Sequence, residues 1–267
     1  MARTPLHRTA RTLAAGAAAV LALALTACSS NNTPSPGSST PAITGTINVF
    51  AAASLTETFN KIGSDFEAAH PGTDVVFNFG SSGTLATQID QGAPADVFAS
   101  ASPATMKQVT DAGNGDGASV VFVRNQLVIV TEKGNPKGIQ GLADLAKPDV
   151  KVALCVDTAP CGAAAKTVLT NANVALTPVF GQDVKATLQY VTLGEVDAAL
   201  VYRTDAKAEP NVDPVEFPES SGAINDYPIV ALKDAANKAG AQAFVAYVLS
   251  DPGIAVLTAA GFQKPTS

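Results

Sequence analysis

The sequence is poor in the residues on which many enzyme active sites depend. It contains only two histidines and three cysteines among 267 residues. His7 lies in the N-terminal segment, and His70 precedes a Pro-Gly turn, where we expect it at the surface. Neither is therefore available for a Ser-His-Asp triad or a zinc site. Because the acidic residues are also scattered, the sequence predicts a protein that is not an enzyme and needs no cofactor.

Positive charge is also scarce. The chain has 17 Lys and Arg residues against 23 Asp and Glu, and three of the basic residues lie in its first 27 positions. The remainder, with 14 basic and 23 acidic residues, has a net charge of −9. Nucleic-acid binding requires a basic surface, so we expect no nucleic-acid partner. An anionic ligand would have to be held by local dipoles rather than by the overall charge.

The first 27 residues predict a signal peptide. Three arginines precede an Ala/Leu-rich stretch over residues 13–25, which is short for a bilayer span. The stretch ends in Leu25-Thr26-Ala27-Cys28, which resembles the lipobox of bacterial lipoproteins. We therefore expect residues 1–27 to be cleaved, Cys28 to carry lipid, and residues 28–43 to form a flexible Ser/Pro-rich tether. A soluble secreted protein and an uncleaved anchor helix are the alternatives.

The other two cysteines, Cys155 and Cys161, flank a short turn. An even pair in an exported protein favours a disulfide. Two buried thiols are the alternative, because the sequence does not give the distance between the two Cα atoms.

The stretch from Phe50 to Glu57 joins a predicted strand to a predicted helix. Residues 46–50 alternate and end apolar, as a buried strand would. The apolar residues that follow recur on one helical face: Leu55, Phe59, Ile62 and Phe66. Ser54 and Glu57 have the spacing of a capping box, which predicts Ser54 at the helix N-terminus. Such a terminus after a strand is a position for anion binding, although a serine there is also an ordinary helix cap.

The same arrangement recurs along the chain. Gly80-Ser81-Ser82-Gly83 separates a predicted strand from a predicted helix, although alone it could be a flexible turn. Pro160-Cys161-Gly162 begins a third helix after a strand, and Asp183 is a predicted N-cap for a fourth. Strand and helix signals alternate throughout, which predicts an α/β fold. The motif Gly80-Ser81-Ser82-Gly83 has neither the spacing of a nucleophile elbow nor the lysine of a P-loop.

Several of these stretches resemble the molybdate-binding proteins of ABC importers. The resemblance covers nearly all of residues 44–263, and it rests on the motifs Val49-Phe50-Ala51-Ala52-Ala53-Ser54-Leu55-Thr56, Phe79-Gly80-Ser81-Ser82-Gly83-Thr84-Leu85-Ala86, Gly92-Ala93-Pro94-Ala95-Asp96-Val97-Phe98-Ala99-Ser100 and Gly194-Glu195-Val196-Asp197-Ala198-Ala199-Leu200-Val201-Tyr202. It implies a two-lobed periplasmic-binding-protein type II fold, in which each lobe is a mixed sheet flanked by helices. Residues 44–124 and 222–267 would form lobe 1, and residues 125–221 lobe 2.

The resemblance also implies a set of ligands for molybdate, held as an oxyanion and not as a bare metal cation. They are the hydroxyl groups of Ser54, Ser82 and Tyr202 and the backbone N–H groups of Cys161 and Val184. The sequence departs from the family pattern at two places. Gly83 stands where a third serine is common, and Cys161 stands where a small residue such as alanine is usual.

The predicted function is therefore that of an extracytoplasmic, lipid-anchored, monomeric protein that captures molybdate or tungstate and delivers it to the membrane permease of an ABC importer. One alternative is a binding protein of the same fold for another anion, such as sulfate, or for a small organic solute. A surface hydrolase or an adhesive lipoprotein is another.

Overall fold

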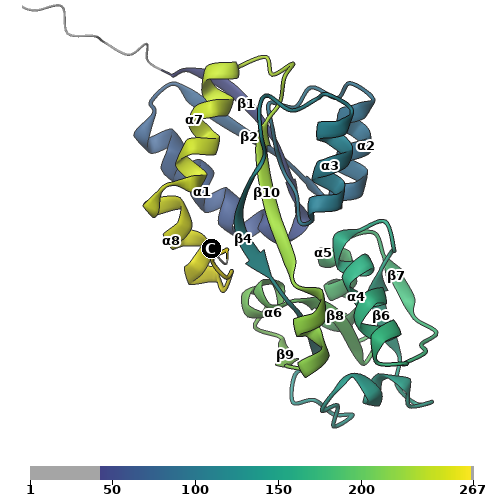
Figure 1. The fold of residues 1–267 in the computed structure, drawn as a ribbon. Helices are drawn as coiled ribbons and strands as arrows, with labels where there is room; N and C mark the ends of the chain where they lie inside the picture. The colour runs from purple at the N-terminus through teal and green to yellow at the C-terminus, as the bar shows by residue number, and fades with distance from the viewer. Residues whose placement is uncertain (1–42, 266–267) are drawn as a thin grey trace, which may run out of the picture. The chain divides into compact units, whose positions relative to one another are not determined.

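The computed structural model describes residues 43–265. The predicted signal peptide, the lipidation at Cys28 and residues 28–42 of the predicted tether lie outside this range. The described residues form two five-stranded mixed sheets, each flanked by helices (Figure 1). The two-lobed α/β fold expected from the sequence is confirmed; we call the part built on the N-terminal sheet lobe 1 and the other lobe 2.

The sheet of lobe 1 has the strand order β2-β1-β3-β10-β4. Strands β1, β2 and β3 are parallel, whereas β10 runs antiparallel to β3 and β4. Helices α2 and α3 cover one face of the sheet, and α1 and α7 cover the other (Figure 1). The bounds are β1 Gly45–Ala52, η1 Ala53–Leu55, α1 Thr56–Ala69, β2 Thr73–Gly80, α2 Ser82–Asp90, β3 Val97–Ala99, α3 Pro103–Asp111, β4 Val120–Asn125, β10 Asn225–Ala231, α7 Lys238–Leu249 and α8 Asp251–Ala260.

The sheet of lobe 2 has the order β7-β6-β8-β5-β9. Strand β6 is parallel to β7 and β8, and β5 is antiparallel to β8 and β9. The bounds are β5 Leu127–Glu132, η2 Leu142–Ala146, β6 Val152–Cys155, α4 Pro160–Asn171, β7 Val179–Gly181, α5 Val184–Thr192, β8 Ala198–Tyr202, α6 Arg203–Ala208, β9 Val212–Val215 and η3 Pro218–Ala223.

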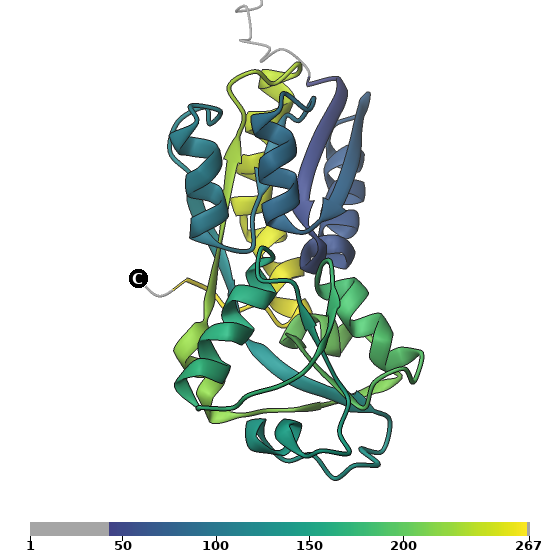
Figure 2. The ribbon, with the colours of Figure 1, turned by 90° about the vertical axis from the view of Figure 1, so that its right-hand side faces the viewer.

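Two segments connect the lobes. The chain leaves lobe 1 at the end of β4 and enters β5 after the single residue Gln126, and it returns from β9 through η3 into β10 (Figure 2). Because β4 and β10 pair with each other, both connections lie side by side. This arrangement places the carboxyl ends of β1 and β2 opposite those of β6 and β7, with the candidate site between them.

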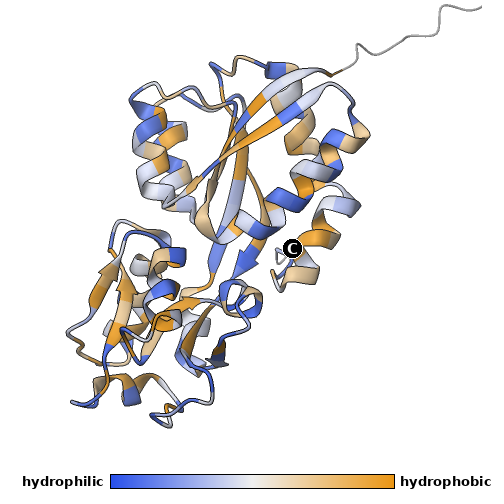
Figure 3. Ribbon diagram, turned by 180° about the vertical axis from the view of Figure 1, so that it is seen from behind, coloured by the Kyte–Doolittle hydropathy of each residue, from blue (hydrophilic) through white to orange (hydrophobic). Residues whose placement is uncertain are grey.

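Burial follows the predicted periodicity closely in α1. Phe59, Ile62 and Phe66 are fully buried against the sheet of lobe 1, and the Phe59 ring lies 6.1 Å from that of Phe244 on α7. Removing such a side chain from a packed core costs about 3–5 kcal/mol of folding free energy. Most strongly apolar residues lie on the strands, whereas polar residues recur along the helices (Figure 3).

Several element bounds differ from the sequence prediction. The strand predicted from Gly194 begins only at Ala198, because Gly194 adopts a left-handed conformation with φ 69° in the turn that ends α5. The sequence patterns predict neither helix α6 nor strand β9. Helix α6 has only six residues, which is too short for a clear periodicity. Strand β9 contains Pro214 and lies at the edge of its sheet. Among residues 43–265 no single helix is long and apolar enough to cross a membrane; α7 and α8 pass that test only as a pair bent by 58°.

Candidate functional site

A small cavity lies between the two lobes and is lined by both. All five residues that the family resemblance implies as ligands line it. The described lining residues are Ala52, Ala53, Ser54, Gly80, Ser81, Ser82 and Ala101 from lobe 1, and Ala159, Pro160, Cys161, Asp183, Val184 and Tyr202 from lobe 2. Small side chains predominate, so the backbone is accessible from the cavity.

Four helix N-termini meet at this cavity, and each follows the carboxyl end of a strand. They belong to η1 after β1, α2 after β2, α4 after β6 and α5 after β7. The first N–H groups of a helix have no acceptor within the helix and carry partial positive charge. Backbone donors from both lobes are therefore directed at one small volume, which is the geometry of an anion site.

The structure corrects the predicted role of Ser54 as a helix cap. Ser54 lies inside η1, α1 follows with Leu55 as its N-cap, and neither cap position makes a side-chain hydrogen bond. The Ser54 Oγ instead lies 2.8 Å from the Tyr227 Oη, and the Glu57 carboxylate binds Lys185 of lobe 2. The expected capping box is absent: Ser54 and Glu57 interact instead with Tyr227 and Lys185, which lie far along the chain.

Ser82 is the first residue of α2, and its hydroxyl oxygen accepts a hydrogen bond from the Ala101 N–H at 3.0 Å. This contact leaves the Ser82 hydroxyl proton free to be donated. The next residue, Gly83, lies against lobe 2: a Cβ atom there would be 2.4 Å from the Thr158 carbonyl oxygen. Because Gly83 has no Cβ atom, the backbones of the two lobes can approach each other beside the cavity.

Two buried hydroxyl groups at the cavity have no protein partner. Among the described residues, the Ser81 Oγ and the Tyr202 Oη are fully buried atoms without a hydrogen bond. Burial raises the pKa of Tyr202 well above its ordinary value, and the neighbouring Tyr227 and Asp205 add to this shift. Tyr202 therefore keeps its proton at neutral pH. An unsatisfied buried hydroxyl costs about 1–3 kcal/mol, which a hydrogen-bond acceptor in the cavity would remove.

The N-terminus of α4 is fixed by a disulfide. Cys155 at the end of β6 is bonded to Cys161, the second residue of α4, and their Cα atoms are 5.8 Å apart. The predicted cysteine pair is thus bonded in the structure. The bond ties the Cys161 N–H, one of the nominated ligands, to the end of a buried strand.

Charged side chains are nearly absent from the cavity. Among its described lining residues only Asp183 is ionisable at neutral pH, and its Oδ1 caps α5 by accepting from the Ala186 N–H at 2.9 Å. The predicted N-cap at Asp183 is therefore confirmed. Within residues 43–265 no group of three His, Cys, Asp or Glu side chains could hold a metal ion. The described lining residues therefore offer mainly hydrogen-bond donors, which suit an anion.

Sequence reasoning missed two residues at this site. Ser81 stands beside the nominated Ser82, and only its burial without a partner distinguishes it. Tyr227 lies 173 positions after Ser54 and in the sequence resembles any apolar residue of a buried strand. The pairing of two strands distant in the chain, rather than a local motif, brings its hydroxyl to the site.

Comparisons with known proteins agree with this geometry. The sequence profile of the bacterial extracellular solute-binding proteins matches residues 47–263. The molybdate-binding protein ModA of Mycobacterium tuberculosis is 42% identical over 249 residues, which cover 92% of this chain and 95% of that relative.

Solved structures show the same fold. The periplasmic molybdate-binding protein of Azotobacter vinelandii superimposes with a TM-score of 0.73 at 22% identity, over 82% of this chain and 100% of that one. The sulfate-binding protein SubI of Mycobacterium tuberculosis does so with a TM-score of 0.68 at 20% identity, over 82% and 87%. At these identities the similarity concerns the fold alone. The sequence match over most of its length establishes that this chain belongs to the family of bacterial extracellular solute-binding proteins, which are binding proteins and not enzymes.

Proposed function

We propose that this chain is the molybdate-binding component of an ABC importer: it captures molybdate or tungstate between its lobes and delivers the ion to the membrane permease. The observation that carries the proposal is the meeting of four helix N-termini and several hydroxyl groups at one cavity. The 42% identity to a protein named for molybdate binding supports the choice of ion.

The proposed ligands are the hydroxyl groups of Ser54, Ser82 and Tyr202 and the N–H groups of Cys161 and Val184. A dianion removed from water needs many hydrogen bonds, because burial of an uncompensated charge is very costly. Hydrogen bonds to a charged acceptor contribute about 1.5–3 kcal/mol each. The unpartnered Ser81 hydroxyl would add a further donor if it turns toward the ion.

A lipid anchor would keep the protein close to the membrane permease. We propose that Cys28 is lipidated and that residues 28–43 tether the two lobes, which would span residues 44–124 with 222–267 and residues 125–221. The Ser/Pro-rich composition of the tether supports this arrangement, because such a segment cannot form a packed core.

The test is a thermal-shift panel on the mature chain with molybdate, tungstate, sulfate, phosphate and common organic solutes. A ligand that binds only the folded state stabilises it by RT ln(1 + [L]/Kd), about 2.7 kcal/mol at one hundred times Kd. For a chain of this size that corresponds to an increase in Tm of about 5–10 °C. We expect this increase with molybdate and tungstate. A larger increase with sulfate, or one only with an organic solute, would contradict the proposal.

A further inference from the structure

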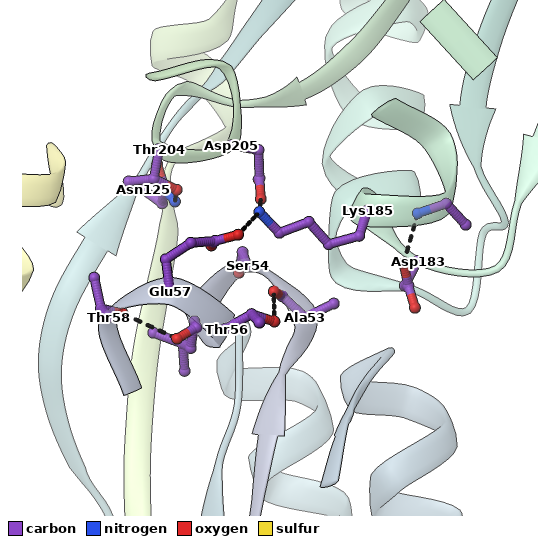
Figure 4. A network of polar contacts seen from close by, with 12 residues as sticks. Ala53, Ser54, Thr56, Glu57, Thr58, Asn125, Asp183, Lys185, Thr204 and Asp205 are labelled. Atoms are coloured by element: carbon purple, nitrogen blue, oxygen red, sulfur yellow. Dashed lines mark hydrogen bonds and ion pairs between the residues drawn. The ribbon is translucent and has the colours of Figure 1, made fainter. Parts of the chain in front are cut away.

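Beside the anion cavity, one lysine links the two lobes. Lys185 follows Val184 in the first turn of α5 in lobe 2. Its Nζ lies 2.7 Å from the Glu57 Oε1 on α1 of lobe 1 and 3.2 Å from the Asp205 Oδ1 on α6 of lobe 2. Figure 4 shows the Lys185 side chain extended across the gap, with Glu57 on one side of its ammonium group and Asp205 on the other.

The two carboxylates differ in their surroundings. The Asp205 side chain is fully buried, and it belongs to the same lobe as Lys185. The Glu57 side chain is half exposed, and it belongs to the opposite lobe. The pair with Asp205 is therefore internal to lobe 2, whereas the pair with Glu57 exists only while the lobes are close together.

The ammonium group is not placed to bind the anion itself. Lys185 does not line the cavity that holds Ser54, Ser82 and Val184. It lines a separate surface pocket together with Glu57, Asp205 and Glu209. Because its charge is already opposed by two carboxylates, Lys185 contributes an interaction between the lobes rather than a ligand.

We propose that Lys185 is a positioning residue that stabilises the closed arrangement of the lobes over the anion. Asp205 holds the ammonium group within lobe 2, and closure brings it to Glu57. The contact fixes the N-terminus of α5, with the Val184 N–H, against the segment of lobe 1 that carries Ser54. This inference rests on the proposed function, because it assigns Lys185 a part in retaining the captured oxyanion.

Two variants separate closure from folding. Glu57→Gln replaces the ion pair between the lobes by at most a neutral hydrogen bond and leaves Lys185 paired with Asp205, so the Tm of the free protein should change little. Lys185→Met removes the same contact and also leaves Asp205 buried without its partner, so it should lower the Tm as well. Lys107→Met is the matched control, because Lys107 pairs with Asp111 on the same exposed helix of lobe 1.

The measurements are the affinity and dissociation rate of molybdate at low and high NaCl, and small-angle scattering of the ligand-free chain. Glu57→Gln and Lys185→Met should each weaken affinity about two- to fivefold, mainly through faster dissociation, as expected for one half-exposed ion pair. The double variant should be no weaker than either single variant. High salt should accelerate dissociation from the wild type and not from the variants. Both variants should shift the free chain toward a larger radius of gyration, and Lys107→Met should change nothing.

Unchanged affinity and salt dependence in Glu57→Gln would overturn the inference while leaving molybdate binding intact. A wild-type chain that binds none of the oxyanions would instead overturn the proposed function. In that case the scattering of the ligand-free variants still decides whether Lys185 holds the lobes together.

Discussion

The Oγ of Ser54 in lobe 1 lies 2.8 Å from the Oη of Tyr227 on β10, and both atoms are buried. Burial raises the pKa of Tyr227 far above its ordinary value, although its contact with Ser54 opposes the shift. Tyr227 therefore always carries a proton. If Tyr227 donates that proton to Ser54, the Ser54 proton is left to point into the cavity. A weaker contact from the Asn125 Nδ2 at 3.5 Å supports this direction, because it uses Tyr227 as an acceptor.

We therefore expect Tyr227→Phe to weaken molybdate binding through Ser54. Ser54→Ala should cost about 1–3 kcal/mol of binding free energy, the range for an unpaired buried polar contact, and Tyr227→Phe somewhat less. In calorimetric titrations the double variant should be no weaker than Ser54→Ala alone. Ser221→Ala, at an exposed serine of η3, should leave the affinity unchanged. Additive losses would show that Tyr227 acts independently of Ser54.

Ser54 and Glu57 also show where prediction from the sequence ends. The strand before them and the apolar face of α1 follow from local periodicity, so both could be predicted. Their three-residue spacing equally predicts a capping box, but Lys185 lies 128 positions from Glu57 and Tyr227 lies 173 from Ser54. Long-range partners of this kind come from the pairing of strands and the approach of lobes, which local spacing does not encode.

The second prediction concerns Gly83, which lies against the Thr158 carbonyl of lobe 2. Replacing it with alanine should raise the stability of the free protein and lower its affinity for the anion. Gly83→Ala should stabilise α2, and with it the free protein, by about 0.4–1 kcal/mol through a lower entropy of the unfolded chain. The new Cβ should also hold the lobes apart and weaken anion binding by about 1–3 kcal/mol. Denaturant unfolding and titration with molybdate measure the two effects separately.

Gly222→Ala is the control for this variant, because a Cβ at position 222 would meet no atom within 4 Å. It should leave the affinity unchanged. If Gly83→Ala binds molybdate as tightly as the wild type, then lobe 2 moves aside without cost, and position 83 does not limit closure.

Asp205 gives a prediction for pH. Burial raises the pKa of its carboxyl from 3.8 to about 6, although the Lys185 ammonium opposes the shift. The folded state therefore binds more protons than the unfolded state between pH 4 and 6, so this group lowers stability as the pH rises through that window. The loss is at most about 3 kcal/mol, since one pKa unit corresponds to about 1.4 kcal/mol.

Asp205→Asn removes this titration. Unfolding free energies of the wild type and the variant should be measured in urea from pH 4 to 7. The stability of the wild type relative to Asp205→Asn should be greatest at pH 4 and should fall toward pH 7. A difference that does not vary with pH would mean that Asp205 ionises in the folded protein as easily as in the unfolded chain.

The chemistry of the cavity predicts which anions it accepts. Every proposed ligand is a donor, and molybdate and tungstate at neutral pH are fully deprotonated, so each of their oxygens can accept. Phosphate near pH 7 still carries a proton that needs an acceptor. Asp183 is the one carboxylate among the described lining residues; its Oδ1 accepts from the Ala186 N–H, and we expect this role as the N-cap of α5 to keep the carboxylate from accepting the phosphate proton. An unpaired buried O–H costs about 1–3 kcal/mol, or roughly ten- to a hundredfold in affinity.

Sulfate is a bare dianion and avoids that cost, but its bonds are shorter than those of molybdate. In a cavity formed for the larger ion its hydrogen bonds would be stretched, and they weaken with distance. We therefore expect molybdate and tungstate to bind tightest, sulfate much more weakly and phosphate most weakly, in calorimetric titrations at pH 7–8. If phosphate instead binds as tightly as molybdate, we would infer that the Asp183 carboxylate accepts the phosphate proton. Asp183→Asn, which keeps a good N-cap for α5, should then abolish phosphate binding alone.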